Sequence, residues 1–262
     1  MNARDQQISG LSRRQLLQAG VAGLTLAVTA QGQVWAASSA EAKKYGADSM
    51  PGGTVADPLV FVSIADSGQV TIVAHRVEMG TGVRTSLPMV VADEMEAKWD
   101  MVQVVQADAN EARYGNQNVD GSRSVRHFFM PMRRVGAAMR QMLEAAAAAQ
   151  WAVPVSEVKA VQHEVVHTPS GKKLGYGALA VAAAKQSVPA ENQRRLKTEA
   201  EFRYIGKGKV HVVDLEGIGK GQAKYGMDQH MPGMVYAVVA RPTVLGTKLR
   251  SYNGDKALKV AG

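Results

Sequence analysis

The sequence predicts an α+β fold, in which short strands and helices follow one another in mixed order. Two observations support this class. Runs rich in β-branched residues mark strands within 60–75 and 102–106, whereas apolar residues repeat at helical spacing through 124–150. More strands and a short helix follow without an internal repeat. We therefore expect one mixed domain over residues 60–185.

The N-terminus has the form of a twin-arginine export signal. Arg13 and Arg14 precede a weakly apolar run over residues 19–30, which is too short and too rich in Gly and Thr to span a bilayer stably. Small residues before Ala37 suit a signal peptidase, so we expect a cleaved signal peptide over 1–36 and a periplasmic protein. Because this route exports folded proteins, it favours a protein that carries a cofactor. An ordinary secretory signal with a chance arginine pair is the alternative.

The composition excludes several kinds of protein. The chain has 31 Lys and Arg against 23 Asp and Glu, but this excess is spread out and aromatic residues make up only 5%, which argues against a nucleic-acid binder. The sequence has no cysteine, so it can form neither disulfides nor cysteine-ligated iron–sulfur clusters. Any electron relay must then lie on a partner.

The first part of the chain reads as strands around one helix. Small polar residues predict an extended segment over 37–59 that leads into the domain. A β-hairpin follows, with strands over 60–65 and 70–75. The apolar residues then change from strand to helical spacing, which predicts a helix over 84–95. A further apolar run predicts a strand over 102–106.

The middle of the chain is dominated by one long helix. After a polar loop over 107–120, apolar residues at helical spacing and a run of alanines predict a helix over 124–150. Strands are expected over 158–161 and 164–167, and a short helix over 178–184.

A polar, charged stretch over 186–209 predicts a linker and a domain boundary. Beyond it, short apolar runs between glycines and prolines predict strands over 210–213, 222–225, 235–240 and 248–251.

Gly80, Thr81 and Gly82 form a turn between a predicted strand and a predicted helix. Glycines let a ligand approach the backbone, and the free N–H groups of a helix N-terminus attract anions. Arg84 lies in the first helical turn and adds a cationic donor, so a phosphate group is the expected ligand. A purely architectural turn is the alternative, because such turns are common.

A second loop, Gly121-Ser122-Arg123-Ser124, opens the long helix and repeats this arrangement. We expect Ser122 or Ser124 to cap the helix, while Arg123 and Arg126 place guanidinium groups near its positive end. Two such helix N-termini could hold a pyrophosphate from two sides.

The long helix carries Arg126, Arg133 and Arg140 at every seventh position, on one face. For Arg133 and Arg140 we expect a solvated basic stripe rather than a binding role.

The segment His163-Glu-Val-Val-His167 matches a zinc-protease pattern, which needs a helix to bring both imidazoles to one metal. Its valines and the following turn residues predict a strand instead. There the two histidines would lie about 13 Å apart and could not share a zinc ion. We therefore assign no metal ligands, and no catalytic residue can be named either.

Taken together, these segments resemble the molybdopterin-binding large subunit of the xanthine dehydrogenase and aldehyde oxidase family. The nearest branch is the isoquinoline 1-oxidoreductase beta-subunit type, often named aldehyde dehydrogenase. The matching stretches are residues 70–75, 78–87, 111–117, 120–129, 131–134 and 232–237.

The resemblance implies a molybdopterin-binding domain over 60–185 and the start of an α/β hammerhead domain over 210–262. The family's cofactor loop falls on Gly80, Thr81 and Gly82, with Thr81 in place of the usual glutamine. Its phosphate loop falls on residues 121–124. The implied cofactor is molybdopterin, in its cytosine dinucleotide form.

The family's chemistry is hydroxylation of an aldehyde or N-heterocycle carbon, with oxygen from water and electrons passed to a small iron–sulfur subunit. Family members are considerably longer, so we expect residues 210–262 to be an incomplete hammerhead domain. The glutamate that acts as the family's general base has no counterpart here. The missing portion, or a chain that supplies it, would be a partner. Two alternatives remain: a non-catalytic remnant or assembly module that binds a partner but no cofactor, and a generic phosphate-binding protein.

Overall fold

The computed structural model describes residues 27–28, 34–35 and 52–260. Two short strands, β1 (Ala27–Val28) and β2 (Val34–Trp35), pair antiparallel. Most of the predicted signal peptide, including both arginines, lies outside the described residues. The chain divides into two units, Met1–Leu215 and Glu216–Gly262, which are described separately below.

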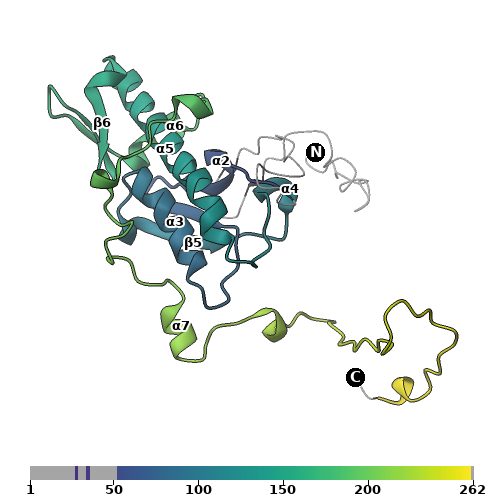
Figure 1. Ribbon diagram of the computed structural model, residues 1–262. Coiled ribbons are helices and arrows are strands. Elements are labelled where there is room, and N and C mark those ends of the chain that lie inside the picture. The colour runs from purple at the N-terminus through teal and green to yellow at the C-terminus, as the bar shows by residue number, and fades with distance from the viewer. Residues whose placement is uncertain (1–26, 29–33, 36–51, 261–262) are drawn as a thin grey trace, which may run out of the picture. The chain divides into compact units, whose positions relative to one another are not determined.

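The first sheet is built around β4 (Val70–Ala74), whose five residues are all buried. It pairs antiparallel with β3 (Val62–Ile64) and parallel with β5 (Val102–Gln106). A central strand buried on both faces is expected to be rich in apolar, β-branched residues, and Val70, Ile72 and Val73 of β4 fit this. The predicted hairpin and third strand are confirmed (Figure 1).

The first half of the predicted opening strand is instead a helical turn, α2 (Pro58–Phe61). The Asp57 carboxylate accepts a hydrogen bond from the Leu59 backbone N–H at 2.9 Å, and Pro58 stands at the start of the turn. A capping aspartate followed by proline favours helix initiation over an extended chain.

Two helices organise the first unit. The connection from β4 to β5 is α3 (Val83–Glu94), close to its predicted bounds. The 28-residue α5 (Ser124–Trp151), about 42 Å long, packs against α3 and against α6 (Tyr176–Ala183). Across the described residues no helix is both long and apolar enough to cross a membrane.

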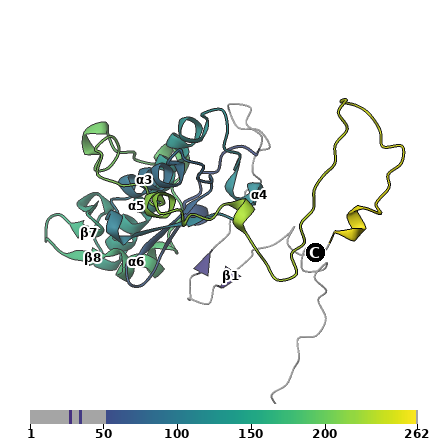
Figure 2. The ribbon, with the colours of Figure 1, turned by 90° about the horizontal axis from the view of Figure 1, so that it is seen from below.

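The second sheet is fully antiparallel, in the order β6 (Val158–Val161), β7 (Glu164–His167) and β8 (Lys173–Gly175). It packs on α5 and lies on the side of the first unit away from α4 (Glu111–Tyr114) (Figures 1 and 2). The α+β class is thus confirmed. The remaining short helices are η1 (Trp99–Met101), η2 (Val155–Glu157), η3 (Glu191–Gln193), η4 (Glu199–Glu201), α7 (Leu215–Gly219), η5 (Gly226–Asp228) and η6 (Ala257–Lys259).

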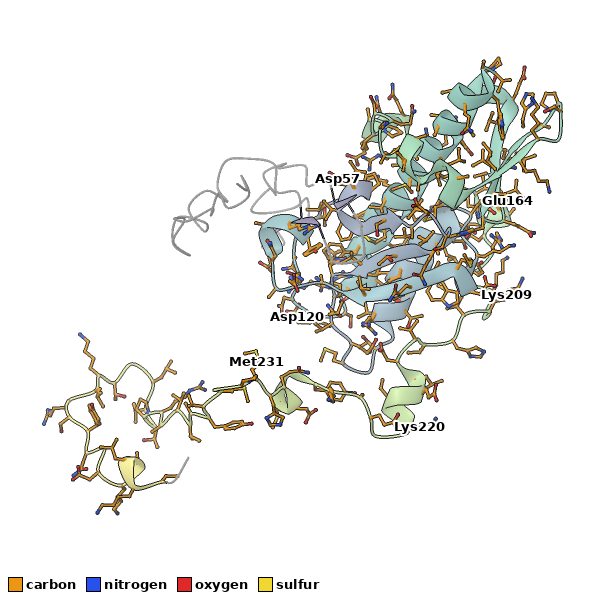
Figure 3. All side chains as sticks on the ribbon, turned by 180° about the vertical axis from the view of Figure 1, so that it is seen from behind. Asp57, Asp120, Glu164, Lys209, Lys220 and Met231 are labelled. Atoms are coloured by element: carbon orange, nitrogen blue, oxygen red, sulfur yellow. The ribbon has the colours of Figure 1, made fainter. Side chains whose placement is uncertain are left out.

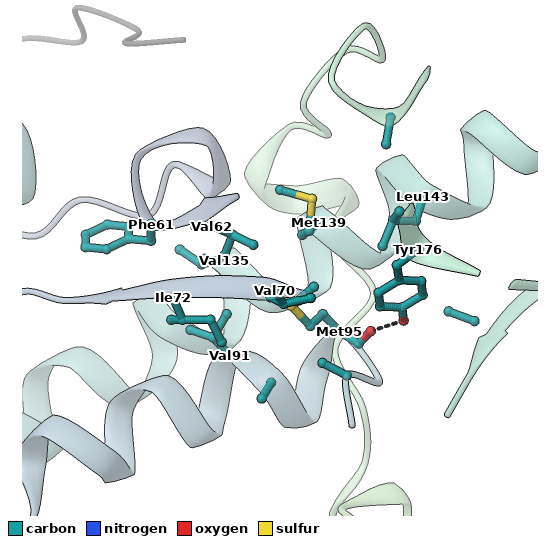
Figure 4. Close-up of a cluster of buried hydrophobic side chains, with 14 of the residues drawn as sticks. Phe61, Val62, Val70, Ile72, Val91, Met95, Val135, Met139, Leu143 and Tyr176 are labelled. Carbon is teal, nitrogen blue, oxygen red and sulfur yellow. Dashed lines mark hydrogen bonds between the residues drawn. The ribbon is translucent and has the colours of Figure 1, made fainter. Parts of the chain in front are cut away.

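The core lies between the first sheet, α3 and α5 (Figure 4). Val135, Met139 and Leu143 belong to the predicted apolar stripe of α5, and all are buried. At one end of the core the fully buried Tyr176 hydroxyl donates a hydrogen bond to the Met95 carbonyl. This bond satisfies a polar group that burial would otherwise leave without a partner.

The approach of α3 to α5 depends on Gly136. A Cβ at this position would lie 2.4 Å from the Val91 carbonyl oxygen and 2.7 Å from Glu94 Cβ. The first contact is with backbone, which has little room to move. Glycine therefore sets the distance between the two helices.

Buried charges fix residues 194–205 onto this helix pair. The Asp93 carboxylate accepts the Lys197 ammonium at 2.8 Å and the backbone N–H groups of Tyr204 and Ile205, each at 2.9 Å. Burial alone would raise the pKa of Asp93, but these donors outweigh it and lower that pKa. Residues 186–209 are irregular apart from two short helical turns, their second half is attached to the first unit, and the division between the units follows Leu215 rather than lying in the predicted linker.

The predicted solvated stripe at Arg133 and Arg140 is wrong. Arg133 Nε donates to the fully buried Glu94 carboxylate at 2.7 Å and its Nη2 to the Lys197 carbonyl. Arg140 Nη1 donates to the Glu94 carbonyl at 2.8 Å and its Nη2 to the Arg195 carbonyl. A buried carboxylate on α3 needs counter-charge, and the facing side of α5 supplies it.

The second unit shows none of the predicted strands within its described residues, 216–260, and residues 210–213 of the first unit are also irregular. Many apolar side chains of this second unit face solvent, among them Val235, Val238 and Leu245 at 85%, 98% and 102% exposure. Near Met231 the side chains point away from an extended backbone (Figure 3). A strand needs a paired neighbour, which local apolar pattern cannot supply.

We expect Gly136→Ala to lower the free energy of unfolding by about 1 to 3 kcal/mol, because the added methyl group must push the helices apart. Gly175→Ala is the control, since a Cβ there meets nothing within 4 Å. Urea denaturation of both variants tests this; equal stability of the two would contradict it.

We expect Lys197→Met to destabilise the protein by about 3 kcal/mol, because Asp93 and Glu96 would stay buried without their shared cation. Lys207→Met removes an exposed lysine as the matched control. Chemical denaturation and limited proteolysis within 186–209 provide the readouts. The expectation is wrong if Lys197→Met is no less stable than the control.

Candidate functional site

The three residues Arg76, Val77 and Glu78 follow β4 and connect it to two helix N-termini. Arg76 Nε donates to Ser124 Oγ at the start of α5, at 3.1 Å. The Glu78 carboxylate accepts the Gly82 N–H at the start of α3, at 2.9 Å. The two predicted loops are thereby brought to one edge of the sheet, at the carboxyl end of its central strand, where ligands of open α/β sheets commonly bind.

Arg76 is a fully buried cation whose hydrogen-bond partners are neutral. Its Nη1 donates to the Asn116 carbonyl at 2.9 Å and to the Asn116 side-chain oxygen at 2.7 Å, and its Nη2 donates to the Asn118 carbonyl. The guanidinium also lies 4.9 Å from the centre of the Phe128 ring. Burial lowers the pKa of Arg76 to about 10, so the group stays charged at pH 7. It adds positive potential to the positive end of α5.

The first predicted loop is already filled by Glu78. Its Oε1 accepts the N–H groups of Gly80 at 2.7 Å and Gly82 at 2.9 Å, and its Oε2 accepts that of Arg84 at 3.3 Å. Partial burial favours the protonated acid, yet these backbone donors outweigh it and lower the pKa of Glu78. Gly80 and Gly82 have φ values of 100° and 72°, which favour glycine. The predicted anion cradle therefore binds the chain's own carboxylate.

The other groups of this loop differ in their surroundings. Thr81 is exposed, so its hydroxyl faces solvent. The Arg84 guanidinium pairs with Asp214, and Thr85 Oγ1 accepts the Val213 N–H at 2.9 Å. The cationic donor expected for phosphate is thus engaged within the chain.

The second predicted loop is arranged differently. Gly121 and Ser122 have φ values of 53° and 55°. Arg123 Nη2 binds Asp120 Oδ2 at 2.7 Å, and Arg123 itself is the N-cap residue of α5. The predicted serine cap is therefore wrong: among the described residues no side chain caps this helix, and the Ser124 hydroxyl instead accepts from Arg76. The first-turn N–H groups of α5 have no partner within the helix and suit an anion.

His75 lies beneath this edge between two aromatic rings, with ring centres 5.2 Å from Phe61 and 4.5 Å from Phe128. Within the described structure neither ring nitrogen has a hydrogen-bond partner. Burial, helped by the nearby Arg76 charge, lowers the pKa of His75 to about 3. The ring is therefore neutral at physiological pH.

His163 directly precedes β7 and His167 ends it, so the strand predicted for this segment is observed. The His163 ring bonds the Gly68 carbonyl at 2.9 Å and accepts the Lys98 N–H at 3.2 Å, whereas His167 bonds Glu157 at 2.9 Å. Within the described residues no group of three or more His, Cys, Asp or Glu side chains could hold a metal ion. Glu164, between the histidines, also lies far from Asp120 of the second loop (Figure 3).

A cavity of about 540 Å³ lies elsewhere on the first unit, between α5, β6 and residues 195–201. Its charges already pair with one another: the exposed Arg195 with the buried Glu144, and the buried Lys197 with Glu96. The cavity thus belongs to the ion network that holds residues 194–205.

Sequence reasoning found both loops but missed Arg76, which joins them. The available signal in the sequence was a charged residue, Arg76, soon after the mostly apolar strand β4. Its contacts with Asn116, Asn118 and Ser124 are more than 38 residues away in the sequence, so local pattern could not reveal them.

Comparison with known proteins identifies the domain. Residues 13–231 match the family described as "Molybdopterin cofactor-binding domain". The chain is 33% identical over 253 residues to isoquinoline 1-oxidoreductase subunit beta of Brevundimonas diminuta, covering 82% of this chain and 32% of that protein. It is 32% identical over 220 residues to a membrane-bound aldehyde dehydrogenase [pyrroloquinoline-quinone] of Gluconacetobacter polyoxogenes, covering 82% and 28%.

The chain thus spans less than a third of the length of these two relatives. Among solved structures, quinoline 2-oxidoreductase of Pseudomonas putida 86 matches with a TM-score of 0.38 and 18% identity, over 47% of this chain and 16% of that one. The resemblance inferred from sequence is confirmed by the family match and by the relative at 33% identity.

We expect stability to depend on His75 below neutral pH. The unfolded chain binds a proton near the ordinary pKa of 6.5, whereas the folded protein does so only near 3. Stability is therefore fully present above pH 6.5 and is lost as the pH falls toward 3, by about 1.4 kcal/mol per pH unit. His75→Leu should flatten this dependence.

Urea denaturation from about pH 7 down to about pH 5 measures the effect. His211→Leu removes an exposed histidine and should keep the wild-type slope. Equal slopes for the two variants would contradict the assignment.

Proposed function

Because the chain belongs to the molybdopterin cofactor-binding domain family, we propose that it is the N-terminal portion of a molybdenum hydroxylase large subunit. The proposed reaction oxidises an aldehyde or the ring carbon of an N-heterocycle, with water as the source of oxygen. Its electrons pass to an iron–sulfur subunit. The names of the relatives, an isoquinoline oxidoreductase subunit and an aldehyde dehydrogenase, support these two substrate classes.

The observation that carries this proposal is the charge distribution at the start of α5. The buried Arg76 cation donates its hydrogen bonds only to neutral groups, with the Asp120 and Glu111 charges acting on it from nearby, and the first-turn N–H groups of α5 lie beside it. Arg126 adds an exposed second guanidinium, whereas that of Arg123 is paired with Asp120. A phosphate of the molybdopterin dinucleotide, proposed here as the cytosine form, fits this end.

Within that proposal the two loops take different parts. Gly121, Ser122, Arg123 and Ser124 bind phosphate through backbone N–H groups and charge. The first loop, Gly80 to Gly82 with Arg84, already carries the Glu78 carboxylate and contacts the cofactor through neutral groups. The exposed Thr81 hydroxyl is its side-chain donor.

When bound, the molybdenum centre supplies two-electron oxidation of the substrate carbon. The described residues of this chain contribute binding and orientation of the cofactor's phosphate end. No residue of the chain is assigned to proton transfer from the reacting oxygen.

The proposed partners follow from composition and exposed surface. The sequence has no cysteine, which supports an iron–sulfur subunit as the electron relay. The exposed apolar residues of the second unit, such as Val235 and Val238, suit strand pairing with a chain that supplies the rest of a large subunit. Export by the twin-arginine route to the periplasm, with the leader over residues 1–36, completes the proposal. The hammerhead assignment of residues 210–262 is likewise a proposal.

A second candidate is a non-catalytic assembly module that binds a partner but no cofactor. Two observations favour it: the first loop is filled by Glu78, and much of the second unit's apolar surface is exposed. Such a module would co-purify with a cysteine-rich subunit and contain no pterin.

We expect the protein, co-produced with its neighbouring subunits and purified, to contain molybdenum and pterin, measured by mass spectrometry and pterin fluorescence. Arg123→Ala should lower cofactor affinity about tenfold, since it removes a charged hydrogen-bond donor. Arg250→Ala, at an exposed position of the second unit, should keep wild-type content. A folded assembly that contains neither molybdenum nor pterin would overturn the proposal and favour the assembly module.

A further inference from the structure

Residues 212–214, here called the strap, cover the N-terminus of α3. The Asp214 carboxylate pairs with the Arg84 guanidinium, and the Val213 N–H donates to Thr85 Oγ1 at 2.9 Å. Val212 Cγ2 lies 3.7 Å from where a Cβ of Gly82 would stand. The strap therefore binds Arg84 and Thr85 in the first turn of the helix and lies beside Gly82.

The strap brings a second carboxylate to a helix end that already holds one. Glu78 Oε2 accepts the Arg84 backbone N–H at 3.3 Å, while Asp214 Oδ1 accepts its guanidinium. Two negative charges thus face one arginine and the partial positive charge of the helix end. With the strap in place, a third negative group is repelled from this position.

The strap contact is also incompletely satisfied. Asp214 Oδ2 is buried and, within the described structure, has no hydrogen-bond partner. The side chains of Arg84 and Asp214 remain 21% and 24% exposed, so solvent screens the ion pair and water can reach it. Release of the strap hydrates Oδ2, which offsets part of the lost pairing.

The geometry points to the strap as an internal competitor for anions: Asp214 occupies the Arg84 guanidinium in place of a phosphate, and an anionic ligand binds this guanidinium only when residues 212–214 leave it, while Glu78 keeps the backbone N–H groups of the loop. This regulation rests on the proposed function, because it concerns the first of the two loops assigned to the cofactor. Under this regulation an anion reaches the N-terminus of α5 first, and it reaches Arg84 at the N-terminus of α3 only after the strap is released.

Inorganic pyrophosphate, titrated calorimetrically into the full chain, tests the competition. Asp214→Asn should bind it about two- to fivefold more tightly than wild type, the range expected for removing one partly exposed charge beside a helix end. Asp255→Asn, an exposed aspartate of the second unit, should match wild type. In the double variant Arg84→Gln with Asp214→Asn the gain should vanish, since the released guanidinium is gone.

Hydrogen exchange of wild-type protein gives a readout that requires no variant to fold. Saturating pyrophosphate should speed exchange of the Val213 amide by displacing it from Thr85. Unchanged or slower exchange there, or equal affinity of the Asp214→Asn and Asp255→Asn variants, would overturn the strap proposal. Molybdenum and pterin content separates the two proposals: cofactor present with no effect of Asp214→Asn refutes only the strap, whereas tighter pyrophosphate binding without any cofactor refutes only the proposed function.

Discussion

The close contact of α3 with α5 is the constraint on which the rest of the first unit depends. Gly136 lets the backbones approach, and the buried Glu94 carboxylate then draws Arg133 from the opposing helix. The same carboxylate pair on α3, Asp93 and Glu94, binds Lys197 and with it the irregular residues 194–205. Since desolvated charges are stable only when paired, α3, α5 and residues 194–205 must assemble together.

This contact also fixes where the two helices begin, and their starts carry opposite charge. Arg76 and Glu78, two residues apart after β4, reach α5 and α3 respectively. Arg76 leaves the start of α5 cationic, whereas the Glu78 carboxylate neutralises the start of α3. Asp214 adds a second negative charge at the start of α3. Two loops that look alike in sequence are therefore unlike in electrostatics: the first is neutralised by two carboxylates, whereas the second keeps Arg76 beside its Asp120–Arg123 ion pair.

Much of the fold could be predicted because its signals are local. β4 is rich in apolar, β-branched residues, α5 repeats its apolar residues at helical spacing, and β6 and β7 have their predicted bounds. The predictions beyond residue 210 failed for a physical reason. An apolar run becomes a strand only beside another strand, and the exposed Val238 has none to pair with among the described residues.

The sequence by itself determined the order of the main elements up to residue 185, the position of both glycine loops and the family, because each depends on residues adjacent in the chain. Tertiary structure alone decided the state of the loops. Glu78 fills one, Asp214 closes it from 130 residues away, and Arg76 supports the other through Asn116 and Ser124. Electrostatic interactions depend on distance in space rather than on separation along the chain. Whether a loop is occupied or open is therefore decided only once the chain has folded.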